Sequence, residues 1–112
     1  MSAYDDIYCL QDFGMIAGSY KILYIDFIYA NGTVINLTEA DSFGCDFCYY
    51  GTADSVFSID GIVDENLSSR MKIEIDSAFT EELGDCCIEY RPYAVYGENT
   101  YKLGKGRIVL EI

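Results

Sequence analysis

Hydrophobic and polar residues alternate along most of the chain, which is typical of β-strands that bury one face in a core. The longest such run spans residues 20–29, where the odd-numbered positions from Leu23 to Phe27 form the face expected to be buried. The dipeptide Asn31-Gly32 follows, and it favours positive φ at both central positions of a tight turn. The sequence therefore predicts a hairpin between strands 20–29 and 33–37.

Turn signals divide the rest of the chain into further strands of the same kind. Pro92 has no N–H group to donate to a sheet, so its strand is expected to have an edge or a bulge there. In the segment 71–75 the odd-numbered residues are predicted to point inward. The strands predicted besides the first hairpin are residues 7–10, 43–49, 55–63, 71–75, 86–96 and 100–112, where 43–49 and 55–63 form a second hairpin and the last two segments form a third.

One segment, residues 77–83, has the pattern of a short helix instead. Asp76 or Ser77 can cap its first turn by accepting a backbone N–H bond, and Gly84 can adopt the left-handed conformation that ends it. Phe79 and Leu83 are four residues apart and therefore share one helical face. A helix this short is not stable alone, so we expect these two side chains to cover an open end of the core.

The pattern as a whole predicts one all-β domain over residues 1–112. A chain of 112 residues is long enough for one hydrophobic core and too short for two. About seven strands at intervals of roughly 8 to 12 residues, with turn signals between them, are typical of a β-sandwich. The expected fold is an antiparallel sandwich of about seven strands with one helical turn near residues 77–83.

Charge narrows the partners that this domain is expected to bind. Seven Lys and Arg against 19 Asp and Glu give a net charge of −12 at pH 7. This charge repels nucleic-acid phosphates, so direct nucleic-acid binding is disfavoured, while basic proteins are attracted. The start of the chain has no signal-peptide pattern, and no apolar run approaches the roughly 20 residues of a membrane span. We expect a soluble protein that is made in a cytoplasm and has no membrane partner.

Cysteines are the residues that most suggest metal binding. Cys45 and Cys48 form a C-x-x-C, and Cys86 and Cys87 are adjacent, so four thiolates could bind zinc. The members of each pair fall on opposite faces of predicted strands, which favours buried, small side chains over a zinc site. The total of five cysteines is odd and fits a reducing compartment better than a disulfide framework.

Acid-base chemistry has few candidates in this sequence. The absence of His removes the commonest general base and the usual dyads with Ser or Cys. Three carboxylate pairs, Asp5-Asp6, Asp64-Glu65 and Glu81-Glu82, fall in predicted turns or termini, where solvent keeps both groups ionised. The sequence therefore predicts no catalytic residue, no metal and no cofactor, and indicates a protein that is not an enzyme.

Tyrosine is the residue type that most indicates a binding surface. The chain has 11 Tyr, more than a core of this size needs, and Tyr combines a large apolar ring with a polar tip that suits protein interfaces. Ordinary cross-strand pairing explains the same residues about equally well. The tyrosines predicted to lie in an interface are Tyr20, Tyr24, Tyr90, Tyr93, Tyr96 and Tyr101.

Several short motifs follow one another in a recognisable order over most of the chain. They are Gly18 before the first long strand, the Asn31-Gly32 turn, the corner Leu37-Thr38, the helical turn of Asp76, Ser77, Thr80 and Leu83, and a closing hairpin with Tyr90 and with Gly104 or Gly106 before its last strand. This order resembles small immunoglobulin-like modules in the virion proteins of tailed bacteriophages. The resemblance implies an immunoglobulin-like sandwich in a baseplate, tail-fibre or head-fibre protein, which binds other phage structural proteins or itself as an oligomer and carries no catalytic residues.

A second function, from another class, fits the charge. A small acidic protein encoded by a phage could inhibit a host defence nuclease, in the manner of an anti-CRISPR protein, by placing carboxylates in its basic nucleic-acid channel. A row of carboxylates on one face would favour this inhibitor. Presence of the chain in purified virions would favour the structural module.

Overall fold

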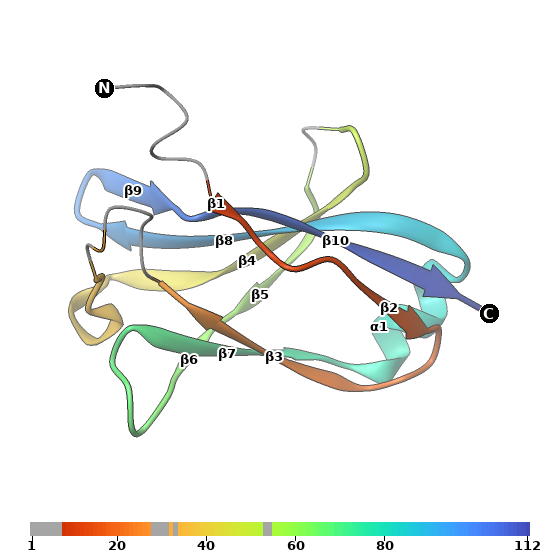
Figure 1. Ribbon diagram of the computed structural model, residues 1–112, viewed down its shortest axis with the longest axis horizontal. Coiled ribbons are helices and arrows are strands. Elements are labelled where there is room, and N and C mark those ends of the chain that lie inside the picture. The colour runs from red at the N-terminus through yellow and green to blue at the C-terminus, as the bar shows by residue number, and fades with distance from the viewer. Residues whose placement is uncertain (1–7, 28–31, 33, 53–54) are drawn as a thin grey trace.

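The computed structural model describes residues 8–27, 32, 34–52 and 55–112. In these residues two β-sheets pack face to face, with one short helix at an end of the sandwich (Figure 1). The elements are β1 (Tyr8–Cys9), β2 (Phe13–Ile16), β3 (Lys21–Asp26), the 3-10 helix η2 (Leu37–Glu39), β4 (Ser42–Tyr49), β5 (Ser55–Asp60), β6 (Ile62–Val63), β7 (Arg70–Ile75), α1 (Ser77–Leu83), β8 (Cys86–Tyr96), β9 (Asn99–Lys102) and β10 (Gly104–Glu111).

The larger sheet has seven strands, with β8 at its centre. Its main order is β1-β10-β8-β4-β5, while β2 also pairs with β10 and β9 also pairs with β8. The pairs among β4, β5, β8, β9 and β10 are antiparallel, as expected from hairpins. The two N-terminal strands β1 and β2 instead run parallel to β10. The start of the described chain is therefore fixed to the last strand of the fold.

The smaller sheet is antiparallel and has the order β3-β7-β6. The chain enters it from the larger sheet through Gly61, which separates β5 from β6. A Cβ at this position would lie 2.8 Å from the Phe43 ring and 2.9 Å from the sulfur of Met71, so these side chains would have to move to admit it. The close approach of the backbone to these two side chains therefore favours glycine at this crossing between the layers.

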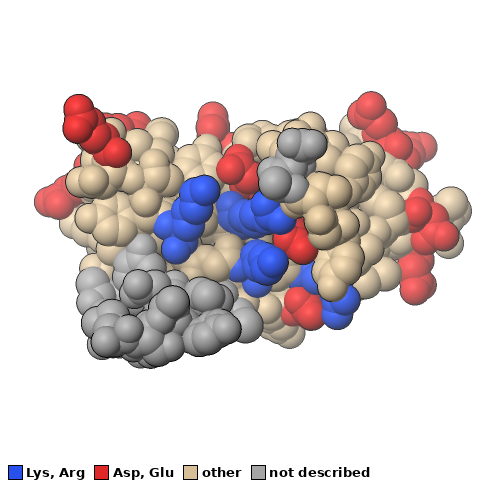
Figure 2. Space-filling model, turned by 90° about the horizontal axis from the view of Figure 1, so that it is seen from above, with Lys and Arg blue, Asp and Glu red and all other residues tan. Residues whose placement is uncertain are grey.

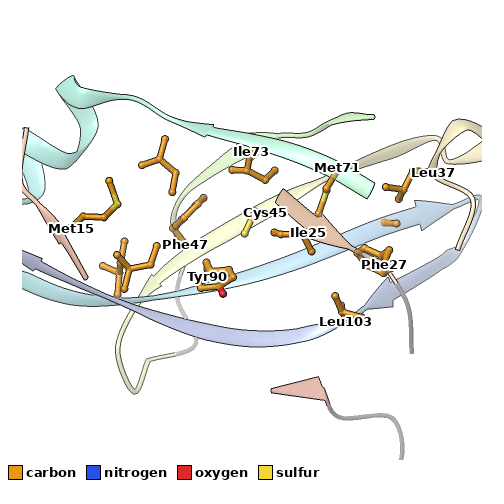
Figure 3. Close-up of a cluster of buried hydrophobic side chains, with 14 of the residues drawn as sticks. Met15, Ile25, Phe27, Leu37, Cys45, Phe47, Met71, Ile73, Tyr90 and Leu103 are labelled. Atoms are coloured by element: carbon orange, nitrogen blue, oxygen red, sulfur yellow. The ribbon is translucent and has the colours of Figure 1, made fainter. Parts of the chain in front are cut away.

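The core lies between the two sheets and consists of the inward side chains of both (Figure 3). Each fully buried aliphatic side chain stabilises the fold by about 1.5–3 kcal/mol relative to an exposed one. The odd-numbered residues of 71–75 are all buried, as the alternation predicts. The buried members of the core are Met15, Ile25, Phe27, Leu37, Cys45, Phe47, Met71, Ile73, Ile75, Ile88, Tyr90, Ala94, Leu103, Ile108 and Leu110.

The helix α1 begins and ends where the sequence predicts. The Asp76 side chain accepts a hydrogen bond of 2.9 Å from the Phe79 N–H, and Gly84 ends the helix with φ of 67°. The Phe79 ring contacts the rings of Phe47 and Phe57, at 6.1 Å between centroids for Phe47. Both Phe79 and Leu83 are half-buried, and Leu83 packs against the core. The helix therefore covers one end of the sandwich.

The fold class predicted from the sequence, an all-β sandwich with one short helical turn, is confirmed. The second and third hairpins are also confirmed, as β4 with β5 and as β8 with β9 and β10. The strands in the described residues number ten rather than about seven, because β2 was not predicted, the predicted strand 55–63 is divided at Gly61, and the last arm is divided at Leu103. Pro92 lies opposite the point where this arm is divided, because its carbonyl accepts a bond of 3.4 Å from the Leu103 N–H. The proline nitrogen, which has no hydrogen to donate, is on the same side of β8.

The predicted strand at residues 33–37 is wrong in its described part. The turn at Asn31 and residues 28–30 and 33 lie outside the described residues. Val34 forms an isolated bridge, and Leu37 begins η2, because the Asn36 side chain accepts a bond of 3.1 Å from the Thr38 N–H and caps a helical turn. One bond of the predicted hairpin is present, from the Ile35 N–H to the Phe27 carbonyl at 3.0 Å, but the strand β3 pairs with β7, which is distant in sequence.

Candidate interaction surfaces

Tyr20 and Tyr24 lie on the outer face of the smaller sheet. The register pairs Tyr24 with Lys72 and Lys72 with Ile62, so these side chains form one row across β3, β7 and β6. Tyr20 and Ile22 precede Tyr24 at intervals of two residues and share its face. Tyr20, Tyr24 and Ile62 are 54%, 56% and 49% exposed. We call the surface formed by Tyr20, Ile22, Tyr24, Ile62 and Lys72 the tyrosine face.

The tyrosine face ends at an unpaired edge of the sheet. Within the described part of the chain β3 pairs with β7 alone, so its other side can offer backbone groups to a further strand. A groove of about 670 Å³ lies beside this edge, lined by β3, by Tyr90 and by the segment from Leu10 to Phe13. The Lys21 ammonium lies 5.0 Å from the centroid of the Phe13 ring and links the two walls. An extended peptide that pairs with β3 would place side chains in this groove.

The other predicted tyrosines lie on the larger sheet. Tyr90 is 2% exposed, its ring is in the core, and its hydroxyl donates to the Gln11 carbonyl; burial raises its pKa to about 12. Tyr96 and Tyr101 pack edge to face, with ring centroids 5.5 Å apart, and the Tyr96 hydroxyl donates to the Asn36 carbonyl. The structure therefore does not bring the six predicted tyrosines together, and it places the Tyr90 ring in the core, beside the groove next to β3.

The outer face of the larger sheet holds four of the seven cationic side chains of the chain. They occupy alternate positions of β8 and β10 and one position of β9, so they point away from the core. Figure 2 views the molecule from this side and shows the Lys and Arg side chains gathered near the middle, with Asp and Glu among and around them. The four cations are Arg91, Lys102, Lys105 and Arg107.

Glu89 is the most deeply buried charge on this side, with 4% of its surface exposed. Its carboxylate accepts a bond of 2.6 Å from Arg91 and one of 3.4 Å from the Gly51 N–H, and the Lys105 ammonium lies 4.0 Å away. Burial alone would raise the pKa of Glu89, but these two hydrogen bonds and the Lys105 charge bring it below its ordinary value. Arg91 also donates to the Thr52 carbonyl at 2.7 Å, so the network ties the turn after β4 to β8.

Carboxylates lie on the opposite side of β8, on β4 and β5. The register pairs Arg91 with Asp46, and it pairs Tyr93 with Gly44, which in turn pairs with Asp60. Burial raises the pKa of Tyr93, and the negative charges of Asp46 and Asp60 raise it further. This outer surface, which we call the charged face, therefore has cations toward β9 and β10 and carboxylates toward β4 and β5. One carboxylate, Asp12, lies on the β10 side and pairs with Arg107 at 3.3 Å.

The four cysteines considered as zinc ligands lie on different sides of the larger sheet. Cys45 is in the core, where burial raises the pKa of its thiol, and Cys48 is buried on the outer side of β4 opposite Glu89. Cys86 and Cys87 are adjacent on β8 and therefore alternate in direction. No group of three or more Cys, Asp or Glu among the described residues is arranged to hold a metal ion.

The charged face was missed by reasoning from the sequence. The spacing of Glu89 with Arg91, and of Lys105 with Arg107, is the two-residue interval that places side chains on one face of a strand. That signal was present in the sequence. The sequence does not contain the register that sets Lys102 beside the outward residues of β8. The overall charge of −12 also conceals a local gathering of cations.

Comparison of the sequence with models of known protein families and with curated proteins finds no match. The phage-module resemblance therefore stays a prediction. Within the described residues, no helix is both long enough and apolar enough to cross a membrane.

Proposed function

We propose that the chain is a non-enzymatic structural module of a tailed-bacteriophage particle, which attaches to other particle proteins through the tyrosine face and the adjacent edge of β3. The order of short motifs from Gly18 onward supports the particle context, because it resembles that of virion immunoglobulin-like modules. The attachment role is supported by the surface itself.

The observation that carries this proposal is the coincidence of exposed apolar side chains with an unpaired strand. Tyr20, Tyr24 and Ile62 are each about half exposed and lie together on one face, which is unusual for a surface that meets only water. Tyr is enriched in protein interfaces, and an open edge accepts a strand by backbone hydrogen bonds. A partner that supplies an extended segment would pair with β3 and cover the tyrosine face at once.

Site-specific photo-crosslinking in infected cells tests this attachment. A photoreactive phenylalanine analogue at Tyr24 should form a covalent adduct with a structural protein of the particle. The matched control is the same substitution at Tyr50, which is 57% exposed but lies beyond β4 on the larger sheet. We expect the adduct at position 24 to be at least tenfold more abundant than the adduct at position 50.

Two outcomes would contradict the proposal. Equal yields of the same adduct from both positions would show that the tyrosine face has no special role. An adduct of position 24 with a basic nuclease would support the inhibitor in place of the structural module.

A further inference from the structure

The charged face is arranged in rows that run from cation to carboxylate. In the row of Tyr93, Lys102 lies on the β9 side, and Gly44 and then Asp60 lie on the β4 and β5 side. Each row thus has a defined polarity across β8, which can be read from the strand register alone.

The neighbouring row repeats this polarity. Gly106 pairs with Tyr90 in an antiparallel register. Lys105 precedes Gly106 and Arg91 follows Tyr90, so the same register sets Lys105 beside Arg91. Across β8, Arg91 pairs with Asp46, whose carboxylate also accepts a hydrogen bond of 2.5 Å from the Ser58 hydroxyl. The Lys105 side chain is 68% exposed, so its ammonium is accessible to a partner in spite of its approach to Glu89.

A surface with this polarity is complementary to itself. A two-fold axis parallel to β8 and lying above the line between β8 and β4 exchanges the two sides of the sheet while keeping each row in place. Lys102 of one copy then faces Asp60 of the other, and Arg91 faces Asp46, so symmetry gives four opposite-charge pairs. An in-plane axis perpendicular to β8 would instead place cations over cations, so the rows select one orientation.

We propose that the charged face is a self-association surface on which a second copy of this chain docks about this two-fold axis. The inference supplies the surface for the oligomer expected in the proposed function, and in that respect it rests on it. The two can still fail separately, because the tyrosine face lies on the other sheet.

A second copy fits this face better than a purely anionic partner. A nucleic acid or an acidic peptide long enough to cross the sheet would meet Asp46 and Asp60 as well as the lysines. A second copy instead sets Lys102 against Asp60 and Arg91 against Asp46. The net charge of −12 per chain opposes association at long range, but at physiological ionic strength charges farther apart than about 8 Å are screened.

Charge reversal on the two halves tests the inference by sedimentation velocity of the full chain at 0.15 M salt. One variant, Lys102→Glu with Lys105→Glu, makes the face more acidic by replacing two of its four cations; the other, Asp46→Asn with Asp60→Lys, makes it more basic by removing the carboxylates of β4 and β5. We expect the wild type to dimerise as its concentration rises and each variant alone to dimerise at least tenfold more weakly. Mixed in equal amounts, the two variants should form a heterodimer, because their faces are then complementary.

Matched controls separate this effect from a change in net charge. Lys21→Glu with Lys72→Glu changes the net charge as the acidic variant does, and Glu74→Lys with Glu81→Gln changes it as the basic variant does, at positions away from the charged face. Both controls should dimerise like the wild type, and thermal unfolding should show that all variants fold. A wild type that stays monomeric up to about 1 mM, a charge-face variant that dimerises as well as the wild type, or a mixture that stays monomeric would overturn the proposal.

Discussion

Tyr90 and Gly106 show how a single missing side chain lets an aromatic ring enter the core. The two residues are paired across β8 and β10, and the Tyr90 ring lies directly against the Gly106 backbone. The ring cannot move aside, because Phe13 packs against it at 5.7 Å between centroids and the hydroxyl is held by the Gln11 carbonyl. A Cβ at position 106 would overlap the ring.

Gly106→Ala is therefore expected to lower the free energy of unfolding by about 1–3 kcal/mol, the usual cost of adding a methyl group to a packed site. Urea denaturation measures this change. The control is Gly14→Ala on β2, where the new Cβ would lie 3.6 Å from the Val109 carbonyl oxygen, an ordinary contact. That variant should unfold like the wild type or be slightly more stable, and an equal loss in both variants would argue against the packing explanation.

Glu89 makes the stability of the fold depend on pH. Its pKa in the folded state is below the ordinary value of 4.5, so the folded state favours the ionised form. The stabilisation is therefore complete at pH values above the ordinary pKa and is lost as pH falls through that value toward the lowered one. Glu89→Gln should cost about 1–3 kcal/mol near pH 7, and this difference from the wild type should shrink below about pH 4.5.

Denaturation of both proteins between pH 3 and pH 8 measures the Glu89 effect. Glu98→Gln is a suitable control, because Glu98 is exposed in the turn between β8 and β9. It should show no comparable pH-dependent difference. A Glu89→Gln deficit that is unchanged at pH 3 would mean that the ionised carboxylate is not its source.

At the scale of elements, Thr80 joins α1 to the turn between β2 and β3. Its hydroxyl oxygen accepts a bond of 2.9 Å from the Gly18 N–H and donates one of 2.9 Å to the Ser19 carbonyl, and the residue is 1% exposed. Two segments 61 and 62 residues apart are thus connected by one side chain. From the sequence, Thr80 is only one residue of a helical turn. The structure shows that its side chain also holds this helix against the turn between β2 and β3.

Thr80→Val keeps the shape of the side chain and removes both hydrogen bonds. We expect the free energy of unfolding to fall by about 1–3 kcal/mol, because the Gly18 and Ser19 backbone groups lose their partner. Amide hydrogen exchange should also become faster at Gly18. Thr38→Val is the control, since the Thr38 hydroxyl bond to Asn36 is exposed and local, and it should change stability by less than about 0.5 kcal/mol.

The elements that the sequence predicts well are those defined by local signals. The alternation in β4, β5, β7, β8 and β10 and the capping residues of α1 identify both the type and the position of each element. The predicted strand at 33–37 failed because Asn36 caps a helical turn, a local bond that competes with strand pairing. The pairing of β3 with β7 and the parallel docking of β1 and β2 depend on contacts distant in sequence, which no local pattern contains.

At the scale of the whole molecule, the two sheets present different outer surfaces. The smaller sheet exposes aromatic and aliphatic side chains beside Lys72, Glu74 and the Asp26–Arg70 ion pair, while the larger sheet exposes mainly charges of both signs. Neither surface could be derived from the sequence, because each is assembled by strands from distant parts of the chain. Of the predicted interface tyrosines, Tyr20 and Tyr24 lie together, whereas Tyr90 belongs to the core.

These two surfaces together suggest one mode of action. The charged face would join two copies of the chain, and the tyrosine faces would then point outward on opposite sides of the pair. Such a pair can hold two partner subunits, which is a useful property for a module that connects proteins in a symmetric assembly. This account requires the chain to be a constituent of the particle.

Quantitative mass spectrometry of purified phage particles tests that requirement most directly. The account predicts that the chain copurifies with infectious particles at a constant ratio to the major structural proteins through successive density gradients. A chain that is abundant in infected cells but lost from particles on purification would contradict it.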